Sequence, residues 1–123
     1  MNKFQAIQSF WSSFGIPAFD ENTVPTGEDR PAFPYITYNA AIGSLGETVA
    51  MSASLWYYGT SWSLITTKLL EIEAALGRGG VTLGLDDGAV WIRKGSPFAQ
   101  RMSDPDDMIR RIYINIEAEY FTE

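Results

Sequence analysis

The sequence predicts an α+β fold in a single small domain, residues 1–123. Two stretches carry apolar residues at the three-and-four spacing of an amphipathic helix, and five others are rich in β-formers or alternate apolar with polar residues as strands do. The length fits one domain, since chains divide at roughly 100 to 200 residues per domain. The expected order, α-β-β-α-β-β-β, favours one mainly antiparallel or mixed sheet with both helices packed on one face.

The first helix is predicted near the start of the chain. Gly15 stands where a left-handed C-cap belongs, and Pro17 prevents continuation, so the helix should end near Phe14. Aromatic residues at helical spacing usually belong to the core, although they can also line a ligand pocket. The apolar stripe of this helix consists of Phe4, Ile7, Trp11 and Phe14.

The second helix is predicted from a cap at Thr60 or Ser61 to a C-cap at Gly77. The segment Gly77–Gly80 is glycine-rich, but it follows a helix and lacks the Gly-Lys-Ser/Thr ending of a phosphate-binding loop, so it reads as a helix stop. The apolar stripe of this helix is Trp62, Ile65, Leu69, Ile72 and Leu76.

Two strands are predicted between the helices. The segment Asp20–Pro34 is polar and Pro-rich, and we expect an irregular surface loop. Tyr35–Asn39 is rich in β-formers and should be a strand. Val49–Tyr57 has the period-2 alternation that places Val49, Met51, Ala53, Leu55 and Tyr57 on one face, and it should be the next strand. The segment Ala41–Thr48 between them contains two glycines and should form an extended hairpin.

Three more strands are predicted after the second helix. Gly80–Leu85 and Ala89–Lys94 flank Asp86-Asp87-Gly88, whose composition is typical of a tight hairpin turn. A loop is expected from Gly95 to Asp107. The chain then closes on its most regular alternation, in which the inward row is Ile112, Ile114, Ile116, Ala118 and Tyr120.

The composition excludes several classes of function. The chain has no His and no Cys, so it cannot build a Ser-His-Asp or Cys-His site or a His-ligated metal site. Nine Lys and Arg against fifteen Asp and Glu give a net charge of −6, which repels nucleic acid and anionic lipid. There is neither a signal-like start nor an apolar run of membrane-spanning length, so we expect a soluble protein made in the cytoplasm.

Carboxylate clusters are the remaining candidates for chemistry. Asp86 and Asp87 are explained by the hairpin turn. Asp104, Asp106 and Asp107 could hold a divalent cation, yet they lack the ordered oxygen spacing of a calcium-binding loop. We interpret them as a solvated turn before the last strand and predict no catalytic, cofactor-binding or metal-binding residue.

Interface residues are predicted on three segments. Leu45 and Glu47 lie in the extended hairpin, and Trp56 and Tyr58 place large aromatic groups on a strand whose opposite face is also apolar. An Arg beside apolar anchors is typical of interfaces, although the loop that contains it can also fold onto its own core. The predicted residues of that loop are Pro97, Phe98, Arg101 and Met102.

Four segments together resemble small tail terminator proteins of long-tailed, non-contractile bacteriophages, and the likeness spans nearly the whole chain. They are Phe10–Phe19, Phe33–Tyr38, Gly95–Met102 and Arg110–Asn115. The resemblance implies a structural virion protein without a cofactor. Such a protein forms a homohexameric ring that stops polymerisation of the tail tube and provides the surface for joining the head.

The resemblance also implies the partners. They are further copies of the chain, the tail tube protein and the head connector, with DNA passing through the ring without specific binding. One alternative is a head-closure or stopper ring protein on the portal side. Another is a module that binds a cation through Asp104, Asp106 and Asp107.

Overall fold

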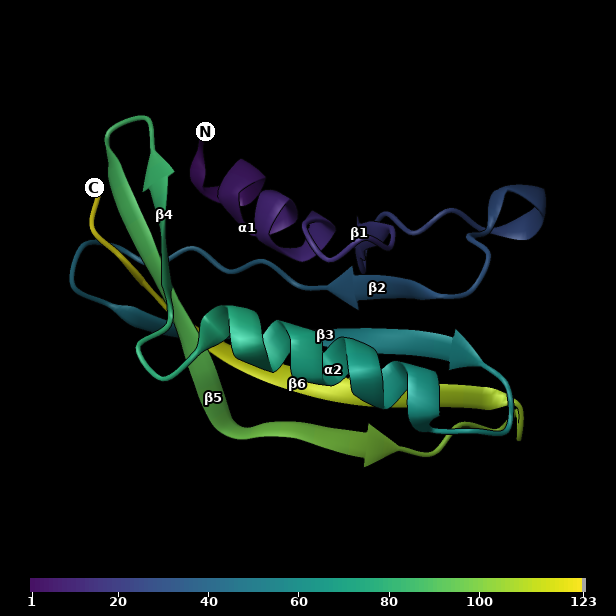
Figure 1. The fold of residues 1–123 in the computed structure, drawn as a ribbon. Helices are drawn as coiled ribbons and strands as arrows, with labels where there is room; N and C mark the ends of the chain where they lie inside the picture. The colour runs from purple at the N-terminus through teal and green to yellow at the C-terminus, as the bar shows by residue number, and fades with distance from the viewer. Residues whose placement is uncertain (123) are drawn as a thin grey trace.

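The computed structural model describes residues 1–122 and confirms the α+β class: two α-helices accompany one curled, mixed, six-stranded sheet (Figure 1). A short 3₁₀ turn, η1, lies in the Pro-rich loop. The elements are α1 (Lys3–Ser12), β1 (Ala18–Asp20), η1 (Gly27–Asp29), β2 (Tyr35–Tyr38), β3 (Thr48–Tyr58), α2 (Ser63–Leu76), β4 (Val81–Leu85), β5 (Gly88–Met102) and β6 (Ile109–Tyr120).

The strands are arranged in the order β1-β2-β3-β6-β5-β4. Only β1 and β2 are parallel, and every other neighbouring pair is antiparallel. The centre is the long pair of β3 and β6, in register from Thr48 opposite Glu119 to Tyr58 opposite Ile109. β6 carries the clearest alternation in the sequence, because its inward row is buried along the strand, whereas β3 is buried on both faces from Met51 to Leu55.

The core lies on one face of the central strands. The predicted inward row of β6 is confirmed, since all five residues are buried. α2 contacts β3, β5 and β6, and α1 contacts β1 and β4. Buried side chains from both helices and from the sheet form one cluster, in which Trp11 is fully buried and packs edge-on against Phe10. The prediction that the aromatic stripe of α1 is core is therefore confirmed, except at Phe4, which is 55% exposed.

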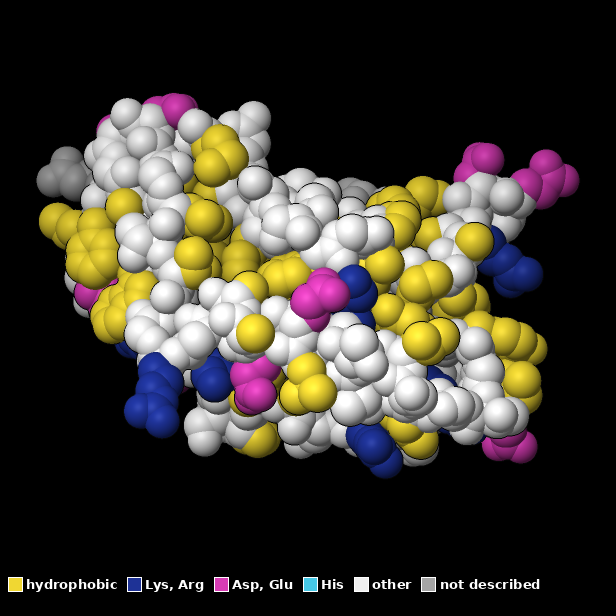
Figure 2. All heavy atoms as spheres, viewed as in Figure 1, with side chains coloured by type: hydrophobic (Ala, Val, Ile, Leu, Met, Phe, Trp, Pro, Cys, Tyr) yellow, Lys and Arg dark blue, Asp and Glu magenta, His cyan; other side chains and the backbone are white. Residues whose placement is uncertain are grey.

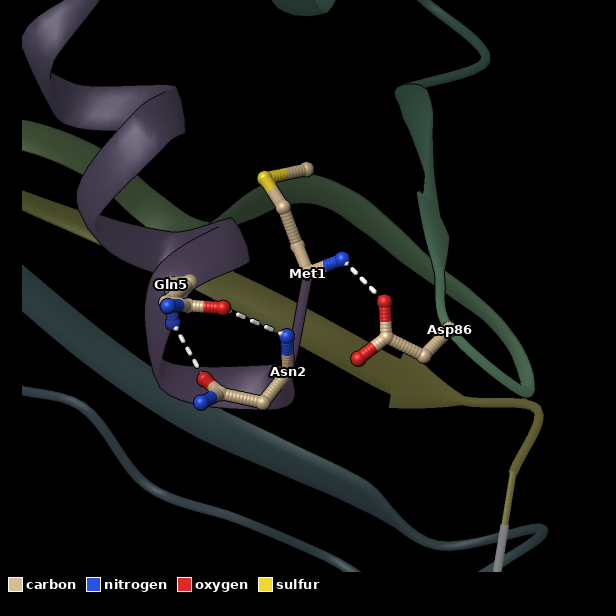
Figure 3. Close-up of polar contacts among 4 residues, drawn as sticks. All are labelled: Met1, Asn2, Gln5 and Asp86. Carbon is tan, nitrogen blue, oxygen red and sulfur yellow. Dashed lines mark hydrogen bonds and ion pairs between the residues drawn. The ribbon is translucent and has the colours of Figure 1, made fainter.

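The first helix begins at a capping box that we did not predict (Figure 3). The Asn2 side chain accepts from the Gln5 backbone N–H at 2.8 Å, and the Gln5 side chain accepts from the Asn2 N–H at 2.9 Å. The Met1 amino group also pairs with Asp86 in the β4–β5 turn. The capping box satisfies N–H groups that the helix end leaves free, and the Met1–Asp86 pair ties the start of the chain to the sheet.

The predicted C-cap of α2 is confirmed, whereas the start of α2 and the end of α1 differ from the prediction. Gly77 caps α2 with φ 60° and donates to Glu73, as expected. The helix starts at Ser63 instead of directly after Thr60 or Ser61, because the Ser61 hydroxyl accepts from Ser63 as part of the preceding turn. α1 stops at Ser12, before Phe14 and Gly15.

The predicted element order lacked one strand. Ala18–Asp20 pairs with β2 at the edge of the sheet, which makes the order α-β-β-β-α-β-β-β. Three residues are too few to show a period-2 pattern, and Asp20 belongs to a residue type that strands disfavour.

The predicted loop from Gly95 to Asp107 is wrong in its first half. β5 continues to Met102, and the pairing with β6 shifts between Lys94 and Ala99. The Asn115 side chain donates to the Pro97 carbonyl at 2.9 Å inside this irregularity. Extra residues in a bulge break the alternation, so the continuing strand is hidden in the sequence.

The hairpin turn is confirmed, with β4 ending at Leu85 and β5 beginning at Gly88. The turn lacks the positive φ angles that tight two-residue hairpin turns usually have, because within residues 1–122 every positive φ belongs to a glycine and Gly88 is not among them.

Candidate interaction surface

An aromatic surface covers one end of the sheet on the face that points away from the core. We define it as Phe33, Tyr35, Trp56, Tyr58 and Arg111. Tyr35 lies opposite Trp56, and Trp56 lies opposite Arg111, so these three side chains form one row across β2, β3 and β6.

The rings of this surface contact one another while remaining partly open to solvent. Tyr35 and Trp56 stack with centroids 6.2 Å apart. Phe33 lies 5.3 Å from Tyr35 and 5.5 Å from Tyr58. Phe33 is 36% exposed and Tyr58 is 58% exposed. Clustered exposed aromatic groups are characteristic of surfaces that a partner covers.

Arg111 is the cationic centre of the aromatic surface. Its guanidinium carbon lies 4.7 Å from the Trp56 ring and 5.8 Å from the Tyr113 ring, and its Nε donates to the Ser54 hydroxyl at 3.0 Å. Trp56 is itself held by a 2.8 Å hydrogen bond to Thr37. No ion pair joins Arg111 to a carboxylate of residues 1–122. A guanidinium fixed in this way can receive a planar anion such as a carboxylate.

A cavity of about 310 Å³ lies in front of Arg111. Glu21 and Val24, from the start of the Pro-rich loop, line it together with the small hydroxyl side chains of β3. Farther along, the same loop borders a wider cleft over Phe33 and Tyr58. Burial raises the pKa of Tyr35 above its ordinary value, and the nearby Arg30 only partly opposes that rise. The Pro-rich loop therefore shapes one wall of the aromatic surface.

The predicted interface residues fall into separate places. Trp56 and Tyr58 belong to the aromatic surface, and Met102 lies beside it because it pairs with Arg111 on the same face. Leu45 and Glu47 lie in the connection between β2 and β3, residues 39–47, which we call the arm. The arm is at the opposite end of β3 from the aromatic surface (Figure 1).

The remaining predicted residues lie on β5. Phe98 is half-buried against the core, with the Lys94 amino group 5.8 Å from its ring. Arg101 pairs with the core-facing Ile112 and stacks on Trp62 at 4.6 Å. Pro97 is exposed at the bulge. Phe98 thus packs against the core of its own chain, which is the alternative that the sequence left open, whereas Arg101 stacks on Trp62 and is exposed. A role of either residue in an interface stays a prediction.

Sequence reasoning did not single out Tyr35 or Arg111, and it covered Phe33 only as part of a contact expected on the Pro-rich loop, Asp20–Pro34. The signal for Arg111 was present in the alternation of β6, since it occupies an outward position two residues before Tyr113. Its pairing with Trp56 depends on the register of distant strands, which no local pattern specifies.

The acidic cluster before β6 forms a turn. The Asp104 carboxylate accepts from the Asp106 N–H at 3.0 Å, and the Asp106 carboxylate accepts from the Met108 N–H at 2.8 Å. Across the described part of the chain, no group of three or more His, Cys, Asp or Glu side chains is placed to hold a metal ion. The carboxylates act as turn caps, as interpreted.

No family model matches the chain, and no curated protein is significantly similar to it. Neither helix of residues 1–122 is long and apolar enough to cross a membrane.

Proposed function

We propose that this protein is a structural virion component, a tail terminator that forms a ring at the head-proximal end of a phage tail tube. The ring, which we expect to be a homohexamer, stops polymerisation of the tube and provides the surface for joining the head. The proposal involves no catalytic step and no cofactor.

The aromatic surface is the observation that carries this proposal. Phe33 and Tyr58 expose ring area next to the row formed by Tyr35, Trp56 and Arg111, on the side of the sheet away from the core. We propose that both helices share the core face, which leaves the opposite face to neighbouring subunits. Aromatic groups and Arg are the residue types enriched at the centres of protein interfaces, so a protein neighbour fits this surface best.

The partners follow from the proposed place in the virion. They are further copies of this chain, the tail tube protein on one side and the head connector on the other. Each subunit carries a net charge of −6, so DNA passes the ring without being held.

Light scattering coupled to size exclusion tests the ring directly, because a single species of several subunits is expected, alone or after addition of tail tubes. In a polymerisation assay, the protein should shorten tubes assembled from purified tail tube protein. Binding to portal-side protein without any effect on tube length would replace the proposal with a head-closure ring.

A further inference from the structure

We propose that the arm of one copy binds the aromatic surface of the next copy, with the Glu47 carboxylate on the Arg111 guanidinium. This contact deepens the proposed ring and rests on that function, because it names the residues that join neighbouring subunits head to tail.

The arm is held in a defined shape at its base. Its first residue, Asn39, is paired with β3, because its side-chain amide donates to the Ser52 hydroxyl at 2.6 Å and its side-chain oxygen accepts from the Ser52 N–H at 3.1 Å. The buried Tyr120 hydroxyl donates to the Ala41 carbonyl at 2.8 Å. A preformed arm loses little conformational freedom on binding, which favours its use as a contact.

The tip of the arm combines exposed apolar groups with a fixed carboxylate. Ile42 is 44% exposed and Leu45 is 57% exposed. Gly46, with φ 83°, lets the chain turn, and the Ser44 N–H donates to the Glu47 carboxylate at 2.8 Å. Hydrogen bonds from Ser44 hold the pKa of Glu47 below its ordinary value. The tip therefore presents a negative charge beside solvent-exposed apolar side chains.

The aromatic surface has the complementary properties. Arg111 is positively charged, and within residues 1–122 it has no carboxylate partner. Its Nε is used by Ser54, which leaves the terminal nitrogens to pair with a carboxylate. The exposed rings of Phe33 and Tyr58 can cover Ile42 and Leu45.

The two surfaces lie at opposite ends of one strand. β3 begins at Thr48, next to the arm, and ends at Tyr58 in the aromatic surface. Its 11 residues span about 34 Å. Figure 1 shows the arm and the arrowhead of β3 at opposite ends of the sheet. Figure 2, seen from the side of α2, shows hydrophobic side chains at both ends of the molecule and between them. Different surfaces meeting head to tail produce a closed ring when the rotation between copies closes.

An acidic projection near the aromatic surface, η1, fits this arrangement less well. Glu28, in η1, already borders the cleft over the aromatic surface of its own subunit. Because η1 and the aromatic surface lie at the same end of the molecule, two copies that exchange this contact would form a two-fold pair and not a ring.

Charge exchange tests the contact. The variants Glu47→Arg and Arg111→Glu should each raise the dissociation constant between subunits about 30-fold or more, as measured by sedimentation velocity. The double variant, and also an equimolar mixture of the two single variants, should recover assembly, since each arm then meets an opposite charge. Glu71→Arg makes the same charge change at an exposed position of α2, away from both surfaces, and should assemble like the wild type.

Three outcomes would overturn the contact. If the wild type forms a ring and both single variants still form it, the ring stands and this contact is wrong. If Glu28→Arg disrupts assembly while Glu47→Arg does not, the two-fold pair replaces it. If the wild type stays monomeric at high concentration and with tail tubes, both the ring and the contact fail. Circular dichroism of each variant shows that loss of assembly is not loss of fold, and Glu47→Arg leaves the Arg111 side intact.

Discussion

At the scale of single residues, Tyr120 connects the core to the arm. Its ring is fully buried at the end of β6, and its hydroxyl donates to the Ala41 carbonyl. Tyr120→Phe should lower the free energy of unfolding by about 1 kcal/mol, because it removes one hydrogen bond while keeping the ring. Urea denaturation measures this loss. Tyr113→Phe is a matched control, since Tyr113 is a partly exposed tyrosine on the same strand, and its effect should be smaller.

The same tyrosine makes the free energy of unfolding decrease at high pH. Burial raises the pKa of Tyr120 above its ordinary value of about 10, so the folded state binds its proton more tightly than the unfolded state does. Its contribution is complete below the unfolded pKa and is lost as pH rises through the folded pKa. Burial also raises the pKa values of Tyr38 and Tyr57. Tyr120→Phe should therefore reduce, without abolishing, the fall of unfolding free energy above pH 10, and an unchanged slope would contradict the assignment.

At the scale of elements, the capping box is a separable source of stability. Asn2→Ala should lower the free energy of unfolding by about 1 kcal/mol, because the Gln5 N–H loses its acceptor at the start of α1. Ser9→Ala, at an exposed position within the same helix, is the control and should be neutral or slightly stabilising. Thermal melting followed by circular dichroism compares the two, and equal effects would mean that the cap contributes nothing.

Asn115 on β6 anchors the irregular segment of β5. Asn115→Ala removes the donor to the Pro97 carbonyl, so the segment between Lys94 and Ala99 loses its side-chain anchor on β6. Hydrogen exchange should become faster at the amides of this segment, while the regular pairing of β3 with β6 keeps its protection. Uniformly faster exchange along the whole chain would instead indicate global destabilisation.

The elements that local patterns specify were predictable, and those that depend on distant pairing were not. β6 could be found because five alternate residues share one buried face. β1 and the second half of β5 could not, because one has three residues and the other contains a bulge. The same distinction applies to the site. Trp56 and Tyr58 could be recognised in the sequence as large aromatic side chains, whereas the position of Arg111 beside Trp56 depends on the register between β3 and β6.

At the scale of the whole molecule, the distribution of charge sets how a ring of this protein would meet DNA. The negative charge of −6 is repeated in every subunit. Several of the nine cations are already engaged within the subunit, as Arg93 is with Glu117 and Glu119. Counterion release from phosphate contacts needs free Lys and Arg, so little binding energy is available.

The assembled protein should therefore show no retardation of duplex DNA in a mobility-shift assay, even at low salt, where electrostatic attraction is strongest. Arg111→Glu provides an informative comparison. If Arg111 is occupied by a neighbouring carboxylate, the charge change should weaken assembly and leave the absence of DNA binding unchanged. A wild-type complex with DNA that weakens steeply with salt and disappears in Arg111→Glu would instead place the guanidinium on a phosphate. That result would contradict both the proposal that DNA passes the ring without being held and the proposed subunit contact.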